Sequence, residues 1–518
     1  MKYSNYLTLI FVFIFSSSYA QLSEKQLDSL VNETLKTFQV PGISVGIIEN
    51  GNIIYAKGHG VRSLNSQLPM DENTLVGIAS NSKGFTCFAI SLLVDDGKIN
   101  WDDKVKKYIP EFDLKDKYAA SEFTIRDLVT HRSGLSLGAG DLMFFPEGGD
   151  STIEDVIHGM SELETESSFR SKFMYNNNFY NIAGEVIKRV SGETWEDFIE
   201  QRILEPVGMM NSKASYNRAK NAENIISAHA PVSGEIVEIP HDWSDLANPA
   251  GGIMSNIPDM LIWAEFLMND GVTKSGERLI SEQQMHELWT LQTPIPIAKN
   301  HPYDTNFYGY GLGWFLSDVA GRFEVTHSGG LLGTVTKFTL LPDLKLGMVI
   351  LTNQQSGAAF MAINNEIKDA YLGYENRDWI SQYRDRMNNF NTKVNEEKAN
   401  VFAEALAFQM QGNFTDKAHV LGEYKDAWLG EINIFEQDRK LRISFQNQPQ
   451  LTGELIPYNP HTYIARWENR SFDADAFLIF SFDETGKSEG FRMKPISDIT
   501  DFSFDFVDLK VKRVEEKN

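Results

Sequence analysis

A serine that stands three residues before a lysine, at the predicted start of a helix, is the feature that most constrains this chain. Ser80 and Lys83 lead into a segment at 84–97 whose apolar residues recur at helical spacing. Side chains three residues apart on a helix lie on one face. In a first helical turn, unpaired backbone N–H groups and the helix dipole favour a developing negative charge. The pattern predicts a nucleophilic serine beside a lysine; the alternative is an N-cap serine followed by a solvated lysine.

Two later motifs favour the catalytic alternative. Tyr175 stands two residues before Asn177. His327 begins a His-x-Gly motif that leads into two strand-like segments at 335–342 and 345–352. A packed aromatic ring at Tyr175, a helix N-cap at Asn177 and a structural histidine at His327 are the non-catalytic alternatives.

The order Ser-x-x-Lys, Tyr-x-Asn, His-x-Gly resembles the serine β-lactamase and penicillin-binding-protein superfamily. It is most similar to the class C-like branch, which includes D-aminopeptidases, D-Ala-D-Ala carboxypeptidases and esterases. Segments at 123–135, 249–255 and 308–314 are similar to that family too, and the resemblance runs from about residue 24 to about residue 372. It implies an α/β (α+β) fold in which an antiparallel sheet built from both chain ends is flanked by helices and carries a helical subdomain.

Three side chains would carry the proton transfers of such an enzyme. Ser80 is the expected nucleophile, and a serine needs a nearby base. A desolvated Lys83, whose pKa falls on burial, is the first candidate for that base. Tyr175 is the second, as a phenolate held by Lys83 and His327. The sequence leaves the choice between them open, and both can share the proton.

The remaining motif residues would bind the substrate. Asn177 is expected to orient Lys83 and donate to a substrate carbonyl, and His327 to bond Tyr175 or the substrate. The backbone N–H groups of Ser80 and Gly330 are the expected oxyanion hole. Gly329 and Gly330 would let a substrate backbone lie close to the strand edge.

Two departures from the family pattern argue against β-lactamase activity. His327 stands where β-lactamases usually have a lysine, and a histidine is mostly neutral at pH 7, so it would hold a substrate carboxylate less firmly. A Glu-x-x-Leu-Asn water-activating motif is also missing. We expect no metal and no cofactor, because the ten histidines are scattered without a His-Glu-x-x-His motif and no Gly-x-x-x-x-Gly-Lys motif occurs.

A chain of 518 residues is too long for one core, and its composition changes along its length. Residues 1–20 are typical of a cleaved signal peptide, which predicts a periplasmic or secreted protein. Residues 21–375 are the expected hydrolase domain, and 376–415 a helical linker. Residues 416–518 alternate polar and apolar side chains and predict a small antiparallel β-barrel. That part resembles, more loosely, the lipocalin-like domain of some serine peptidases that act on D-amino-acid peptides.

Charge and cysteine content limit the partners. The net charge is −23, from 48 basic and 71 acidic residues, which argues against duplex nucleic acid and anionic membranes. No apolar run beyond the signal peptide is long enough for a membrane span. Cys87 is the sole cysteine, so an intramolecular disulfide is excluded, and its apolar helix predicts a buried thiol. A homo-oligomer stays open.

The sequence therefore predicts an exported serine hydrolase that works through an acyl-enzyme on Ser80. A peptidase directed at D-amino-acid-containing peptides is the first expectation, with a small molecule or peptide as substrate. A carboxylesterase or a β-lactamase of the same fold is the alternative. A non-catalytic ligand-binding homologue is a third, against which the intact Ser80, Lys83 and Tyr175 argue.

Overall fold

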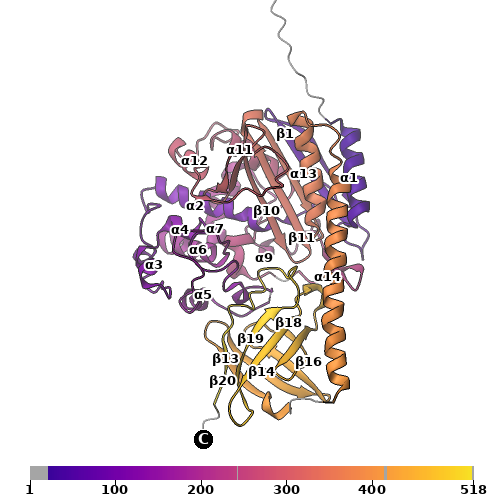
Figure 1. Cartoon of the computed structure of the whole chain (residues 1–518). Helices are drawn as coiled ribbons and strands as arrows, with labels where there is room; N and C mark the ends of the chain where they lie inside the picture. Colours follow the sequence, from indigo (N-terminus) through magenta and orange to yellow (C-terminus); the bar gives the residue numbers. More distant parts are fainter. Residues whose placement is uncertain (1–21, 147, 242, 413–416, 516–518) are drawn as a thin grey trace, which may run out of the picture.

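The computed structural model describes residues 22–146, 148–241, 243–412 and 417–515 (Figure 1). They form a sheet domain with helices on both faces, one long helix and a closed β-barrel. The predicted signal peptide lies outside the described residues. Within the described ranges, no helix combines the length and apolar character that crossing a bilayer requires.

The central sheet has eight antiparallel strands in the order β2-β1-β12-β11-β10-β9-β8-β7. Its strands are β1 (Gly42–Glu49), β2 (Asn52–Gly60), β7 (Thr293–Pro294), β8 (Tyr308–Tyr310), β9 (Phe315–Val319), β10 (Arg322–Leu331), β11 (Thr334–Leu341) and β12 (Leu346–Thr352). β1 pairs with β12, so the sheet joins both ends of the domain, as the family resemblance implied. The turn between β1 and β2 places Asn50 and Gly51 at φ 50° and 75°, the left-handed conformation that an Asn-Gly hairpin favours.

Helices cover both faces of this sheet because side chains on a strand alternate between them. On β12, Met348 and Ile350 belong to a core with α1 (Glu24–Phe38) and α13 (Gly357–Leu372). Val349 and Leu351 belong to the core on the other face, which includes α2 (Ser82–Asp95) and α11 (Ile257–Met268).

A helical subdomain is inserted between β2 and β7. Its further helices are α3 (Lys117–Glu122), α4 (Ile125–Leu128), α5 (Ile153–Met160), α6 (Asn178–Ser191), α7 (Trp195–Ile199), α8 (Glu205–Val207), α9 (Tyr216–Ala219), α10 (Asn248–Gly251) and α12 (Glu282–Leu288). Two small ladders accompany them: β3 (Val76–Gly77) with β6 (Met254–Ser255), and β4 (Ala228–Val232) with β5 (Glu235–Ile239). α6 packs against both α2 and α10, which brings three segments of the predicted site together.

The second domain is a closed eight-stranded barrel reached through α14 (Trp379–Met410). The barrel consists of β13 (Gly422–Asp426), β14 (Gly430–Gln437), β15 (Lys440–Phe445), β16 (Thr452–Asn459), β17 (Thr462–Trp467), β18 (Ala476–Phe482), β19 (Ser488–Pro495) and β20 (Val511–Arg513). α14 packs on α13 and on β16, and in Figure 1 it runs beside the sheet domain and continues along the barrel. The predicted fold class, including the C-terminal barrel, is confirmed; the domain boundaries stay predictions.

Candidate active site

Ser80 lies in a short 3-10 turn (Ala79–Asn81) that leads directly into α2. Ala79 adopts φ 51°, a left-handed conformation that residues other than glycine rarely take and that recurs at functional sites. Asn81 ties the turn to the sheet, because its Nδ2 atom donates to Thr336 Oγ1 on β11 at 2.9 Å. The Ser82 hydroxyl accepts the N–H group of Ile253 at 3.1 Å. The nucleophile candidate is thus held on a strained and anchored turn.

Lys83 is fully buried in the first turn of α2, and three oxygen atoms surround its amine. The Nζ atom lies 3.1 Å from Ser80 Oγ, 2.8 Å from Asn177 Oδ1 and 2.7 Å from the carbonyl oxygen of Ala250 on α10. The Asn177 amide oxygen and the Ala250 carbonyl oxygen can only accept hydrogen bonds, so each takes one N–H group of the Lys83 amine. The third position of the nitrogen therefore points at Ser80.

Burial lowers the pKa of Lys83 to about 7, against a smaller opposing effect of the Asp141 carboxylate. At neutral pH a large share of this amine is unprotonated. A neutral amine has two N–H bonds and one lone pair, and the two fixed acceptors already occupy the N–H bonds. The lone pair is then free to accept the hydroxyl proton of Ser80.

Tyr175 lies half-buried in the loop before α6 and hydrogen-bonds to Ser80 through its hydroxyl. The Lys83 Nζ atom stands 4.9 Å from the centre of its ring, and the His131 ring lies against it at 4.2 Å between centroids. Burial raises the pKa of Tyr175 above its ordinary value. The tyrosine is therefore a protonated phenol at neutral pH.

Asn177 bridges Lys83 to a carboxylate that the sequence motifs did not include. Its Oδ1 atom accepts from Lys83, and its Nδ2 atom donates to Asp141 Oδ2 at 2.8 Å. The residue sits at the N-cap position of α6, yet its side chain makes no capping hydrogen bond. The polar groups of its side chain are directed into the site instead.

His327 is buried on β10, and both of its ring nitrogens have partners within the protein. Nδ1 lies 2.6 Å from the carbonyl oxygen of Ser328, and Nε2 lies 3.1 Å from the hydroxyl of Tyr310. Because a carbonyl only accepts, Nδ1 carries the proton and Nε2 accepts from the tyrosine. Burial and the nearby Lys83 lower the pKa of His327 to about 3, so the ring is neutral. Its ring centroid is 6.3 Å from that of Tyr175.

The two glycines of the third motif have different surroundings. A Cβ atom at Gly329 would lie 2.3 Å from the carbonyl oxygen of Ile78 and 2.7 Å from Ala79 Cβ. At Gly330 a Cβ atom would meet nothing within 4 Å. Gly329 thus permits close packing of β10 on the turn that carries Ser80, whereas Gly330 faces open space.

The structure brings all the predicted site residues into one region and adds groups that the motifs missed. Ala250 and Tyr310 lie in segments already noted as family-like, at 249–255 and 308–314, but no pattern assigned them a role. Asp141 belongs to no motif. Ser503 reaches the site from the barrel, since its Oγ donates to Asp141 Oδ2 at 2.8 Å, and nothing in the sequence signals this contact.

Other candidate sites are weaker. No group of three or more His, Cys, Asp or Glu side chains suited to a metal ion occurs within the part of the chain that the structure describes. The thiol of Cys87 is buried, 3.8 Å from the Tyr180 hydroxyl.

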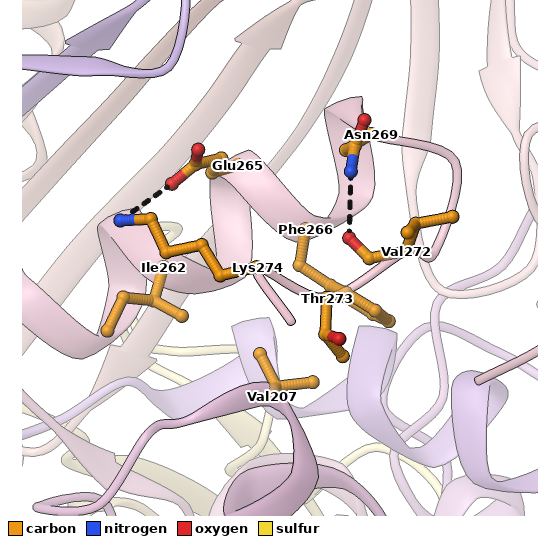
Figure 2. Close-up of a pocket in the computed structure, with 8 residues that line it drawn as sticks. All are labelled: Val207, Ile262, Glu265, Phe266, Asn269, Val272, Thr273 and Lys274. Carbon is orange, nitrogen blue, oxygen red and sulfur yellow. Dashed lines mark hydrogen bonds and ion pairs between the residues drawn. The ribbon is translucent and has the colours of Figure 1, made fainter. Parts of the chain in front are cut away.

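Figure 2 shows a recess beside α11 that is lined by residues such as Val207 and Phe266. The volume of the recess is about 30 Å³, which leaves room for little more than one water molecule. None of the predicted site residues lines it.

Comparison with known proteins identifies related sequences for both domains. The family model described as Beta-lactamase matches residues 27–372, and a domain family of unknown function, DUF3471, matches residues 419–513. The chain is 28% identical over 384 residues to the unguisins hydrolase ungD of Aspergillus violaceofuscus, covering 68% of this chain and 66% of that protein. It therefore spans just under two thirds of that relative's length. It is 24% identical to Protein flp of Staphylococcus aureus, with 71% of each chain covered.

Solved structures show the same fold at low sequence identity. An octameric penicillin-binding protein homologue from Pyrococcus abyssi superposes with a TM-score of 0.61 at 23% identity, covering 89% of this chain and 97% of that chain. A class C β-lactamase superposes with a TM-score of 0.54 at 20% identity, covering 68% of this chain and 97% of the enzyme. The first comparison covers far more of this chain than a hydrolase domain alone would.

Proposed function

Because the chain belongs to the β-lactamase family of serine hydrolases, we propose that it hydrolyses its substrate through an acyl-enzyme on Ser80. The observation that carries this proposal is the placement of Lys83, a fully buried amine 3.1 Å from the serine hydroxyl with its other two hydrogen-bonding positions occupied. An inert N-cap serine beside a solvated lysine would have neither this burial nor this arrangement of acceptors.

In the proposed first half-reaction, neutral Lys83 takes the hydroxyl proton of Ser80, and the serine oxygen attacks the substrate carbonyl carbon. The carbonyl oxygen becomes an oxyanion, which the backbone N–H groups of Ser80 and Gly330 stabilise. The phenol of Tyr175 then gives its proton to the leaving group as the bond breaks, and Lys83 returns a proton to Tyr175. We favour Lys83 as the base because burial makes its amine neutral near pH 7 while it keeps Tyr175 protonated.

In the second half-reaction a water molecule attacks the acyl-enzyme carbonyl and loses a proton to the same Lys83–Tyr175 pair. Ser80 regains its proton as the ester bond breaks, and the acid product leaves. Within the protein, both Lys83 and Tyr175 contact Ser80, and the scheme uses only these three side chains for proton transfer.

We propose a peptide that contains a D-amino acid as the substrate class. The support is the resemblance of the motifs to D-aminopeptidases and D-Ala-D-Ala carboxypeptidases. The relative named as an unguisins hydrolase supports a hydrolase more generally. The neutral His327 offers no positive charge for a β-lactam carboxylate, which argues against β-lactamase activity. A carboxylesterase is the second candidate, because an ester needs no cation for its recognition.

We also propose that the protein is exported and forms a homo-oligomer. The support for export is the signal-peptide pattern at residues 1–20. The support for an oligomer is the structural similarity to a homologue described as octameric, which covers 89% of this chain. Size-exclusion chromatography with light scattering on the full mature chain tests the oligomer, and sequencing the N-terminus of secreted protein tests the cleavage.

Fluorophosphonate labelling followed by peptide mapping tests the proposed function. We expect the label on Ser80 and on no other serine, and no label in Ser80→Ala at unchanged melting temperature. Matched peptides with a D- or L-residue at the scissile bond, together with a neutral ester, then rank the substrates. An unlabelled wild type, or a Ser80→Ala variant that still turns over the ranked substrate, would refute the nucleophile assignment and favour a ligand-binding homologue.

A further inference from the structure

The chain segment between β19 and β20 of the barrel extends to the candidate active site. The Ser503 hydroxyl donates a hydrogen bond to Asp141 Oδ2 at 2.8 Å, and Asp505 Oδ2 accepts a hydrogen bond from the backbone N–H of Gly140 at 2.7 Å. The ring of Phe502 lies edge-on against Tyr175, with 5.9 Å between centroids. Three contacts within four residues therefore tie one barrel loop to the loops that hold Asp141 and Tyr175.

A continuous chain of hydrogen bonds connects Lys83 to Ser503. Lys83 donates to Asn177 Oδ1, Asn177 Nδ2 donates to Asp141 Oδ2, and Ser503 donates to the same carboxylate oxygen. An ionised carboxylate only accepts hydrogen bonds. In its ionised form Asp141 therefore requires the Nδ2 atom of Asn177 to face it, and this orientation turns Oδ1 toward Lys83.

We propose that Asp141 and Ser503 are positioning residues for Lys83, and that the barrel completes the catalytic site through Ser503. Asp141 fixes the orientation of the Asn177 amide. It also places a negative charge near the Lys83 amine, with the Asn177 side chain between the two groups. Ser503 holds that carboxylate in its ionised form and in this orientation. The inference rests on the proposed role of Lys83 as the base for Ser80.

The electrostatics agree with this geometry. Burial raises the pKa of Asp141 to about 7, and the hydrogen bonds from Asn177 and Ser503 oppose that rise, as does the charge of Lys83. In return, the carboxylate opposes the lowering of the Lys83 pKa by burial. Loss of the carboxylate charge should thus make Lys83 easier to deprotonate.

Other titratable groups face this pair and are unchanged by the variants below. Those near the amine are Cys87, His131, Tyr175, Tyr180 and His327. Those near the carboxylate of Asp141, on the barrel loop, are Asp501 and Asp505. Each variant changes only Asp141 or Ser503 and leaves these side chains in place.

Asp141→Asn separates charge from hydrogen bonding. The amide oxygen at the position of Oδ2 still accepts from Asn177 and Ser503, whereas the negative charge is gone. We expect the acidic limb of the pH profile for the second-order labelling of Ser80 by a fluorophosphonate to move to lower pH by about one unit. A change in packing alone would lower the rate at every pH and leave the limb in place.

Ser503→Ala leaves the carboxyl group of Asp141 in place but removes its hydrogen bond from the barrel. We expect about a tenfold slower limiting rate of labelling, as is typical for a lost hydrogen bond to a charged group, with the half-saturating probe concentration unchanged. Ser503→Thr keeps the hydroxyl and should restore the rate. Ser497→Ala is the matched control, because Ser497 lies on the same loop and its hydroxyl accepts only the N–H of Ile499 among the contacts described.

In the double variant Asp141→Asn with Ser503→Ala, removal of the Ser503 hydroxyl should slow labelling by less than the roughly tenfold expected in the wild type, because both residues act through one carboxyl group. A wild type that labels on Ser80, with an unshifted acidic limb in Asp141→Asn or a wild-type rate in Ser503→Ala, would overturn the inference while leaving the proposed function intact. A wild type without label on Ser80 would overturn the proposed function itself. Where Asp141→Asn does not fold, Ser503→Ala decides the question alone.

Discussion

Gly329 on β10 lies against the backbone of Ile78, where a Cβ atom would come within 2.3 Å of the carbonyl oxygen. The strand and the turn that presents Ser80 are therefore in direct backbone contact. This contact sets the distance between the turn that carries Ser80 and the edge of β10. A glycine is the residue that permits it.

Gly329→Ala should separate the strand from the nucleophile turn without removing any reacting group. We expect a loss of about 1–3 kcal/mol in unfolding free energy from overpacking, together with slower labelling of Ser80. Thermal melting and fluorophosphonate kinetics measure the two effects. Gly330→Ala is the stability control, because its Cβ atom would meet nothing within 4 Å, and it should melt like the wild type. Equal melting temperatures for both variants would show that the contact is not tight.

Acylation should rise with pH through about pH 7. Below that pH, Lys83 is protonated and cannot accept the serine proton; above it, the amine is neutral, because burial has lowered its pKa to about 7. A pH profile of kcat/KM with a neutral ester checks the position of this limb. A limb near pH 10, the ordinary range of a lysine, would contradict the assignment of Lys83 as a buried base.

Lys83→Ala and Tyr175→Phe should each slow acylation by roughly 10²–10⁴-fold, the usual range for a lost proton-transfer group. Both residues contact Ser80, so they act on the same proton and the double variant should lose much less than the product. Single-turnover kinetics on the two variants and their combination measure this. Fully multiplicative losses would mean that the two groups act independently.

The candidate catalytic groups that the sequence predicted share one property: each lies in a short motif. Ser80 and Lys83 are one helical turn apart, so local geometry alone predicts their contact. The strand alternation that predicted the barrel is similarly local, and the barrel was confirmed. Asp141 and Ser503 meet only through the packing of two domains, and no periodicity or spacing along the chain encodes that.

The hydrogen-bond partners of His327 also could not be predicted from the sequence. The motif predicted a histidine that bonds Tyr175 or the substrate, and this role stays a prediction. Both ring nitrogens are engaged by Tyr310 and Ser328, which depends on how β8 and β10 lie in the folded sheet. A sequence shows that a histidine is present. Its tautomer and the hydrogen-bond partners of its ring nitrogens depend on how the neighbouring strands lie.

His327→Lys should raise the acylation rate of carboxylate-bearing β-lactams relative to neutral esters. The native ring is neutral at physiological pH because its pKa is lowered to about 3, whereas a lysine supplies a positive charge more readily. Labelling by a fluorescent penicillin, compared with hydrolysis of an ester, gives the ratio. His327→Gln is the control, because it can still donate to Ser328 without adding charge. An unchanged ratio in His327→Lys would mean that this position does not face the substrate carboxylate.

Phe502 should restrict access to Tyr175 from the side of the barrel. Its side chain is 40% exposed, packs edge-on against the tyrosine ring and covers Gly138, where a Cβ atom would lie 2.7 Å from it. We expect Phe502→Ala to change KM for peptides severalfold while labelling by a small fluorophosphonate stays close to wild type. Val507→Ala is the matched control, since that side chain is 61% exposed on the same loop. A small probe slowed as much as the peptides would instead show that Phe502 supports the position of Tyr175, because only a displaced phenol would affect substrates of every size.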